Sequence, residues 1–149
     1  MREILFRGKT KAITGCPYNN GKPDGEWVLG FVFSDLGAMK IRQHETDRPE
    51  CNDYEVDPET VGQYTGLTDK NGRKIFEGDI IEGHCHSQWN HELMRCVIAY
   101  NRDHFEARHY TNGIHGNYFT YKTVFSKDVV VIGNIYDNPE LMEAKDDGT

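Results

Sequence analysis

The fold is decided by residues 68–81, which read TDKNGRKIFEGDII. The pair Asn71-Gly72 is the strongest short signal for a tight turn, and the apolar pair after it predicts a strand. Gly78-Asp79 then interrupts the run just before Ile80-Ile81, a position that is typical of a bend or bulge leading into a new strand. This stretch predicts β-structure made of short strands and tight turns.

The same pattern continues along the chain, where β-branched and aromatic runs alternate with turn formers. Residues 15–25 are rich in Gly, Pro and Asn and predict a loop, and residues 34–37 predict a turn. Residues 105–110 and 118–125 predict a hairpin. Further strands are predicted at residues 4–6, 26–33, 39–42, 96–100 and 127–132, whereas the polar residues 43–53 indicate no element.

Two short helices are predicted from one kind of capping chemistry, in Asp57-Pro58-Glu59 and in Asn138-Pro139-Glu140. The Asp or Asn side chain accepts hydrogen bonds from the free N–H groups of a first helical turn. Proline loses nothing at the first helical position, and glutamate suits the positive end of the helix dipole. Each site predicts a helix of one or two turns.

The length of 149 residues and the hydrophobic content of 37% fit one domain or two small lobes. We predict a mainly β fold, with an α+β fold carrying few short helices as the neighbouring class. An N-terminal β lobe is expected over residues 1–62. A small barrel-like β lobe with a short C-terminal helix is expected over residues 63–141, followed by an acidic tail at residues 142–149. A single integrated domain is the alternative.

The formal net charge of −7 bears on the partner. Nucleic-acid binding through phosphate neutralisation requires Lys and Arg clustered on one face. Here the basic residues form only small local groups, so nucleic acid is the less favoured partner; Lys70, Arg73 and Lys74 are the candidate binding residues if it is one. The aromatic residues between 110 and 125 fit a core or a subunit interface better than a base-stacking platform.

A metal site is the other chemical hypothesis. His84 and His86 lie two residues apart and would share a face on a strand, with His91 close by in the sequence. Imidazole nitrogens are ordinary zinc ligands, but this spacing matches no standard zinc motif and equally fits a surface loop. Glu77 and Asp79 would also share a strand face and could act as an acid/base pair, although a turn cap is the favoured interpretation of Asp79.

Other signatures exclude several classes. The chain has no G-x-S-x-G elbow, no phosphate-binding glycine loop and no H-E-x-x-H, and we expect no cofactor. Its 4 cysteines include no C-x-x-C, so free thiols are expected. Residues 1–7 lack the apolar stretch of a signal peptide, and no apolar run is long enough to cross a bilayer. We therefore expect a cytoplasmic location and no membrane association.

Three segments together resemble the YopX family, which is typical of bacteriophages and prophages. They are residues 1–7, 56–81 and 131–141, and residues 25–30 also look like a strand of that family. The resemblance implies a mostly β fold, a phage or prophage origin and a bacterial cytoplasmic setting. It brings no catalytic residues, because no activity is assigned to the family as a group.

Three functional hypotheses follow. The leading one is a non-enzymatic phage accessory protein that binds a host or phage protein and forms a homo-oligomer. The second is a nucleic-acid-associated small-barrel module that uses Lys70, Arg73 and Lys74. The third is a metal-dependent hydrolase that uses His84 and His86, with His91 or a nearby carboxylate.

Overall fold

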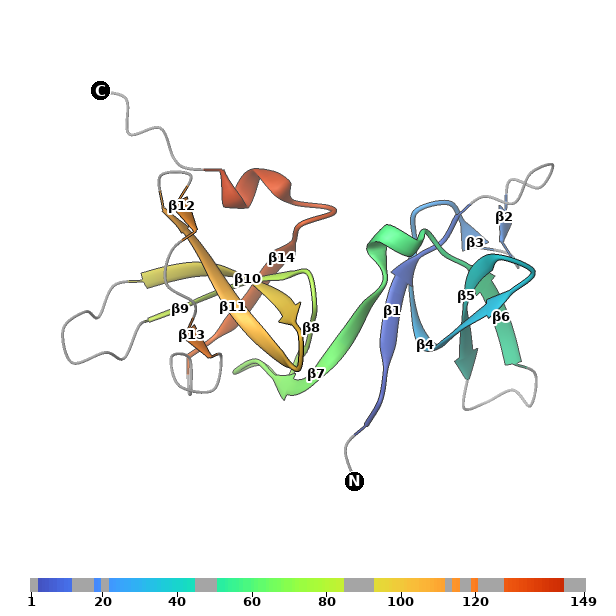
Figure 1. The fold of residues 1–149 in the computed structure, drawn as a ribbon, viewed down its shortest axis with the longest axis horizontal. Helices are drawn as coiled ribbons and strands as arrows, with labels where there is room; N and C mark the ends of the chain where they lie inside the picture. Colours follow the sequence, from blue (N-terminus) through green and yellow to red (C-terminus); the bar gives the residue numbers. More distant parts are fainter. Residues whose placement is uncertain are drawn as a thin grey trace. The chain divides into compact units, whose positions relative to one another are not determined.

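The computed structural model describes residues 3–11, 18–19, 22–44, 51–84, 93–111, 114–115, 119–120 and 128–143. The chain divides into two compact units, Met1–Gly66 and Leu67–Thr149. Both units are built from antiparallel strands (Figure 1). The predicted mainly β class, with β-structure in each half, is confirmed.

The N-terminal unit contains one twisted antiparallel sheet, with strand order β6-β5-β4-β1-β7, which we call the N-terminal sheet. Its last strand, β7, runs on into the second unit, where β8 lies beside it. A separate two-stranded hairpin joins β2 to β3. The strands are β1 (Phe6–Lys9), β2 (Tyr18–Asn19), β3 (Lys22–Pro23), β4 (Trp27–Asp35), β5 (Ala38–His44), β6 (Cys51–Glu55) and β7 (Gly62–Thr68).

The core of the N-terminal unit covers one face of this sheet. Val28, Ile41, Tyr54 and Val56 are each at most 3% exposed and pack together. Because strand residues alternate between faces, Val28, Gly30 and Val32 of β4 point to this side, and their neighbours in the sequence point to the other. We call that other side the outer face.

The β4–β5 hairpin closes on Leu36 and Gly37, whose φ angles of 48° and 81° are both positive. A two-residue turn of that kind matches the twist of the strands, which is why a turn predicted at residues 34–37 is found there. Gly30 is needed for a different reason. A Cβ at this position would overlap the carbonyl oxygen of Arg42 on β5, so the two backbones approach closely only because Gly30 has no side chain.

One prediction for the N-terminal unit is wrong. The loop expected at residues 15–25 contains the β2–β3 hairpin, in which Tyr18 pairs with Pro23 and Asn19 with Lys22. No element was assigned to residues 43–53 from the sequence. At the two ends of this stretch β5 continues to His44 and β6 begins at Cys51, and the pairing of these two strands organises their polar residues.

The first helix cap is confirmed. The η1 helix, Pro58–Thr60, is a single 3₁₀ turn, and Asp57 Oδ1 accepts the Glu59 N–H at 3.1 Å. Thr60 ties this turn to the sheet, since its Oγ1 accepts the Lys9 N–H at 2.9 Å. The opening strand was expected at residues 4–6 but begins at Phe6, although the Leu5 carbonyl already accepts a hydrogen bond from the Tyr64 N–H.

The C-terminal unit is organised around a second antiparallel sheet, with strand order β12-β11-β10-β9-β14, which we call the C-terminal sheet. The short strand β13 also pairs with β11. The elements are β8 (Lys74–Phe76), β9 (Asp79–His84), β10 (Leu93–Asn101), β11 (His104–Thr111), β12 (Ile114–His115), β13 (Phe119–Thr120), β14 (Val130–Asn134) and the η2 turn (Pro139–Met142).

One cluster of buried side chains forms the core of the C-terminal unit, and Ile75 of β8 belongs to it together with Ile81, Ile98 and Val131. Phe105 packs against the same cluster. Cys96 is a buried free thiol in this core, as expected; the other cysteine side chains lie outside the described residues.

The hairpin expected between residues 105–110 and 118–125 is found in part, since Glu106 pairs with Thr120 and Ala107 with Phe119. The rest of the strand predicted at residues 118–125 lies outside the described residues. Where the structure describes the chain, no helix has the length and hydrophobicity needed to cross a bilayer.

Asp69 holds the turn at residues 69–73 against the edge of the C-terminal sheet. It is 6% exposed, and its Oδ1 accepts the N–H groups of Asn71 and Arg73, both at 2.9 Å. Its Oδ2 accepts the Val131 N–H of β14 at 3.1 Å, and the Lys70 N–H donates to the Val129 carbonyl at 3.0 Å. Because β14 is the last strand of the sheet, the turn takes the place of a further strand along that edge.

A second junction joins the bend at Gly78 to the end of β14. Gly78 has φ +88°, and a Cβ there would lie 2.9 Å from the ring of Tyr136. Its carbonyl accepts the Ile135 N–H at 3.0 Å. Asp79 is fully buried, and its Oδ2 accepts the Phe76 N–H at 2.8 Å, so the turn-cap interpretation of Asp79 is confirmed. Glu77 lies in the turn before β9, so the two carboxylates are not partners on one strand.

The second helix cap differs from the prediction. Asn138 makes no side-chain hydrogen bond into the η2 turn. Its Oδ1 instead lies 3.4 Å from the Asn134 N–H, while Asn134 Oδ1 accepts the N–H groups of Tyr136 and Asp137. The side chain of Asn138 therefore closes the turn that precedes η2 and does not cap the helix.

Replacement of Asp69 by alanine tests this edge. The change leaves three buried or part-buried N–H groups without their acceptor, so we expect Asp69→Ala to lower the free energy of unfolding by about 3 kcal/mol. Lys70→Ala is the matched control, because it keeps the Lys70 backbone bond and removes only an exposed side chain, with an expected change within about 0.5 kcal/mol. Denaturant unfolding measures both, and equal stability of the two variants would contradict the role of Asp69.

The pH dependence follows from the same carboxylate. Burial opposes ionisation of Asp69, but the N–H donors of Val131, Arg73 and Asn71 and the charge of Arg73 outweigh it, so its pKa is lowered. A lowered folded-state pKa means that the stabilisation is present above the unfolded-state pKa and is lost as the pH falls through the folded-state pKa. We expect the stability gap between the wild type and Asp69→Ala to shrink in acid, as measured by denaturant unfolding across pH.

Candidate binding surface on the N-terminal sheet

The residues proposed for nucleic-acid binding lie around the Asp69 turn. Lys70 and Arg73 are exposed in the turn itself, and Lys74 is half-buried at the start of β8. The turn is explained by its folding contacts, since its backbone and the Asp69 carboxylate fix the edge of β14. Whether these three side chains bind phosphate stays a prediction.

The proposed metal ligands are not brought together in the part of the chain that the structure describes. His84 ends β9, and its Nδ1 lies 2.7 Å from Asp128 Oδ2. His86 and His91 lie outside the described residues. Within the described ranges, no group of three or more His, Cys, Asp or Glu side chains is placed to hold a metal ion. The hydrolase hypothesis gains no support.

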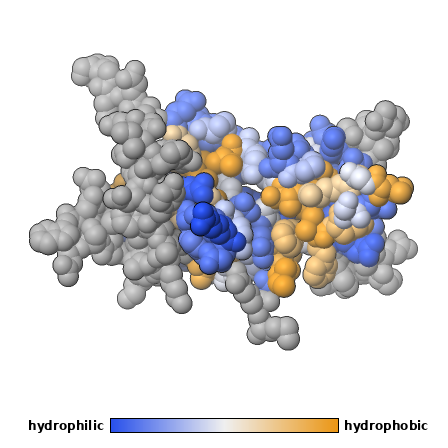
Figure 2. All heavy atoms as spheres, in the orientation of Figure 1, coloured by the Kyte–Doolittle hydropathy of each residue, from blue (hydrophilic) through white to orange (hydrophobic). Residues whose placement is uncertain are grey.

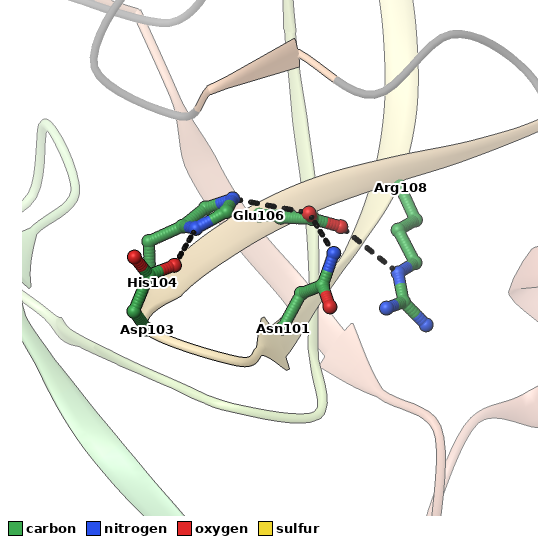
Figure 3. A network of polar contacts seen from close by, with 5 residues as sticks. All are labelled: Asn101, Asp103, His104, Glu106 and Arg108. Atoms are coloured by element: carbon green, nitrogen blue, oxygen red, sulfur yellow. Dashed lines mark hydrogen bonds and ion pairs between the residues drawn. The ribbon is translucent and has the colours of Figure 1, made fainter.

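A polar network that the sequence analysis missed lies at the β10–β11 hairpin (Figure 3). Glu106 is only 4% exposed and accepts hydrogen bonds from Asn101 Nδ2 at 2.6 Å and Arg108 Nε at 3.2 Å. His104 bridges two carboxylates: its Nε2 lies 3.1 Å from Glu106 Oε1, and its Nδ1 lies 2.7 Å from Asp103 Oδ1. Since both ring nitrogens are engaged, the network ties the two strands of the hairpin together.

The charges of this network support one another. The hydrogen bond and charge of Asp103, aided by Glu106 and only partly opposed by desolvation, raise the pKa of His104 above its ordinary value. Burial works against the Glu106 carboxylate, but the bonds from Asn101 and Arg108 and the neighbouring positive charges lower its pKa. The signal for the network was the spacing of His104, Glu106 and Arg108, which share a strand face.

The outer face of the N-terminal sheet carries a row of large apolar side chains along β4. Leu29 is 38% exposed and Phe31 is 60% exposed, and the two lie next to each other on this face. Trp27 and Phe33 continue the row on either side and are half-buried. We call Trp27, Leu29, Phe31 and Phe33 the β4 stripe. Figure 2 shows hydrophobic residues gathered over this unit beside hydrophilic ones.

Each residue of the β4 stripe lies directly opposite a basic residue. On one side β1 pairs with the first half of the stripe, and on the other side β5 pairs with the second half. Directly opposite residues of antiparallel strands point to the same face. The pairs are Trp27 with Lys9, Leu29 with Arg7, Phe31 with Arg42 and Phe33 with Lys40.

Several of these cations stack on the aromatic rings. The Arg7 guanidinium lies 4.6 Å from the ring centroid of Trp27 and is itself almost fully covered, and Lys9 Nζ lies 5.5 Å from the same ring. The Arg42 guanidinium lies 5.0 Å from the centroid of Phe33. These contacts hold the rings of Trp27 and Phe33 in place and leave Leu29 and Phe31 as the open centre of the stripe.

Ion pairs hold the β5 cations at the rim. Arg42 forms two parallel hydrogen bonds with Asp53, at 2.8 and 3.1 Å, and Lys40 Nζ lies 3.1 Å from Asp35 Oδ2. The bonds from Arg42, which outweigh the effect of burial, lower the pKa of Asp53. An apolar centre with a charged rim is the usual anatomy of a protein-binding surface.

The comparisons with known proteins identify the family. The family model described as "YopX protein" matches residues 33–143. The chain belongs to the YopX family. The resemblance noted from the sequence is thereby confirmed, and the turn at Asp69 and the bend at Gly78 fall within the matched residues. Of the β4 stripe, only Phe33 does.

Solved structures also resemble this YopX chain. The crystal structure of protein EF1440 from Enterococcus faecalis shares 22% sequence identity with it, with a TM-score of 0.45, and the match covers 96% of this chain and 100% of that chain. No curated protein sequence matches the chain.

Titration of His104 tests the polar network. Removing the Asp103 charge by Asp103→Asn withdraws the largest source of the raised His104 pKa, so we expect that pKa to fall towards the ordinary value near 6.5. Glu106→Gln should lower it less. A raised folded-state pKa gives stabilisation that is full below the unfolded-state pKa and is lost as the pH rises through the folded-state pKa. NMR titration of the imidazole measures this, and an unchanged pKa in Asp103→Asn would contradict the geometry.

Proposed function

We propose that this YopX protein is a non-catalytic binding protein that engages another protein through the β4 stripe. The single observation that carries the proposal is the exposure of Leu29 and Phe31 side by side on one face of the N-terminal sheet. Burying a Leu or Phe side chain contributes about 1.5–3 kcal/mol, so these two side chains can anchor a partner. Aromatic and arginine side chains are also the residues that most often dominate protein interfaces.

The rest of the described chain supports binding in preference to chemistry. The buried carboxylates of Asp69, Asp79 and Glu106 each accept hydrogen bonds that hold a turn or a hairpin. His104 is bonded through both ring nitrogens, and His84 is bonded to Asp128. The hydrogen bonds that these groups make within turns and hairpins explain their positions in the fold.

The biological setting is part of the same proposal. We propose that the protein is a phage or prophage accessory factor that acts in the bacterial cytoplasm on a host or phage protein. The resemblance to a family typical of phages and prophages supports this setting. The partner's identity is the question that the experiment below addresses.

Site-specific photo-crosslinking tests the proposed function. A photoreactive benzoylphenylalanine at position 31 replaces one aromatic side chain by another, and the same group at Leu36 is the control. Leu36 is fully exposed at the hairpin tip of the same unit and lies off the stripe. On irradiation in the producing bacterium, we expect a single protein to be crosslinked from position 31 and not from position 36.

A second substitution makes the test specific. Leu29→Ser, added to the position-31 probe, removes the neighbouring anchor and should abolish the crosslinked product. Equal products from positions 31 and 36 would contradict the proposal, as would no product from position 31. If the crosslinked product contained nucleic acid or a second copy of the chain, that molecule, and not another protein, would be the ligand of the β4 stripe.

A further inference from the structure

We propose that the partner presents an acidic segment with one or two apolar anchors to the β4 stripe. This inference rests on the proposed function and adds the chemistry that the partner must have. The anchors would cover Leu29 and Phe31, and carboxylates beside them would meet the basic residues that pair with the stripe.

The size of the open centre limits the apolar part of the partner. Only Leu29 and Phe31 are exposed in the stripe, while Trp27 and Phe33 are half-buried with cations against their rings. Two neighbouring side chains on one strand face are about 7 Å apart. An exposed patch of this length can be covered by one large or two small side chains of the partner. The surface therefore fits a short segment and not a broad apolar plate.

The basic residues on β1 and β5 that border the β4 stripe determine which charge the partner should carry. Both strands next to β4 place basic residues on this face, with Lys9 half-exposed on β1, and with Arg42 and Lys40 on β5 exposing 50% and 29% of their side chains. Of the acidic residues of the face, Asp53 and Glu55 lie one strand further out on β6, and Asp35 lies at the end of β4, where it bonds to Lys40. A segment laid over Leu29 and Phe31 therefore has basic residues on both neighbouring strands, which is electrostatic complementarity for carboxylates over this part of β4.

Single-stranded nucleic acid fits this face less well. Base stacking needs open ring faces, and here cationic groups lie over the rings of Trp27 and Phe33. The net charge of −7 adds repulsion that grows with the charge of a polyanion, whereas a segment with a few carboxylates meets much less of it.

A second copy of the chain also fits less well, for a geometric reason. Two copies that pack these faces together are related by a two-fold axis that lies in the interface. An axis along β4 places β1 of one copy over β5 of the other, and an axis across the strands places β1 over β1. The first arrangement brings Lys9 of one copy towards Arg42 of the other, and the second brings Lys9 towards Lys9 of the other copy. Both place like charges close together.

A peptide pair tests the inference on the full chain. Two short peptides of equal length and identical apolar residues, one with Glu and one with Lys at the remaining positions, are titrated into ¹⁵N-labelled protein. The Glu peptide should shift the amide signals of Leu29, Phe31 and Arg42 with saturation. We expect the Lys peptide to bind at least about tenfold more weakly.

Matched variants separate the anchor from the rim. Phe31→Ser should weaken binding of the Glu peptide about tenfold, while Leu36→Asn, which removes an exposed apolar side chain away from the stripe, should not change it. Lys9→Glu should weaken it several-fold, and Lys70→Glu, a charge reversal in the other unit, should not.

Four outcomes overturn the inference. They are no binding of the Glu peptide, equal binding of the Lys peptide, undiminished binding to Phe31→Ser, and tighter binding of a single-stranded oligothymidine to the same amides. The crosslinking experiment separates this failure from that of the proposed function. A crosslinked partner whose contacting segment lacks carboxylates leaves the proposed function standing and refutes only the acidic partner, whereas no crosslinked protein at all refutes both.

Discussion

The carboxylate of Asp69 binds the edge strand of the C-terminal sheet, and the positions of the turn at residues 69–73 and of β14 depend on this contact. Its two oxygens receive three backbone N–H groups, two from its own turn and one from Val131 on β14. An open edge strand exposes a row of donors and acceptors that favours pairing with other chains. Here the buried carboxylate of Asp69, whose pKa is lowered by those same donors, accepts the N–H group of Val131 at this edge. The contact also fixes where the β7–β8 connection lies relative to β14.

This contact links two of the three segments that carry the family resemblance. Residues 56–81 contain Asp69, Gly78 and Asp79, and residues 131–141 contain the groups that they meet. Val131 donates to Asp69, Tyr136 packs over Gly78, and Asn134 pairs with Asp79 in the β9–β14 ladder. The family signature in this chain is therefore a folding signature, because its members contact one another across the unit.

The sequence predicted most of the fold because local chemistry determines most of it. The turns at Gly37 and Gly72, the Asp57 cap and the Gly78 bend each depend on residues within a few positions of one another. Two kinds of feature escaped. The first kind, β6 and the β2–β3 hairpin, depends on pairing with neighbouring strands. The second is the side chain of Asn138, which contacts the backbone of Asn134, four residues earlier, and does not cap the helix that follows it.

The candidate site was harder to predict for a related reason. Residues 26–33 were correctly interpreted as a strand, but a strand that is apolar on both faces looks the same whether a second layer covers it or not. Only the register shows that Lys9, Arg7, Arg42 and Lys40 lie opposite the β4 stripe. The residues singled out beforehand drew attention because of their chemical type, whereas the β4 stripe is defined by exposure, which is a property of the folded chain.

The central claim is that the β4 stripe is a surface for a partner and not part of the core. The free energy of unfolding of Phe31→Ser, measured beside Val28→Ser on the opposite face of the same strand, tests this most directly. Val28 is 1% exposed and Phe31 is 60% exposed. The account predicts a loss of about 3 kcal/mol for Val28→Ser and a change within about 1 kcal/mol for Phe31→Ser. A loss for Phe31→Ser as large as that for Val28→Ser would show that Phe31 stabilises the fold and would contradict the account.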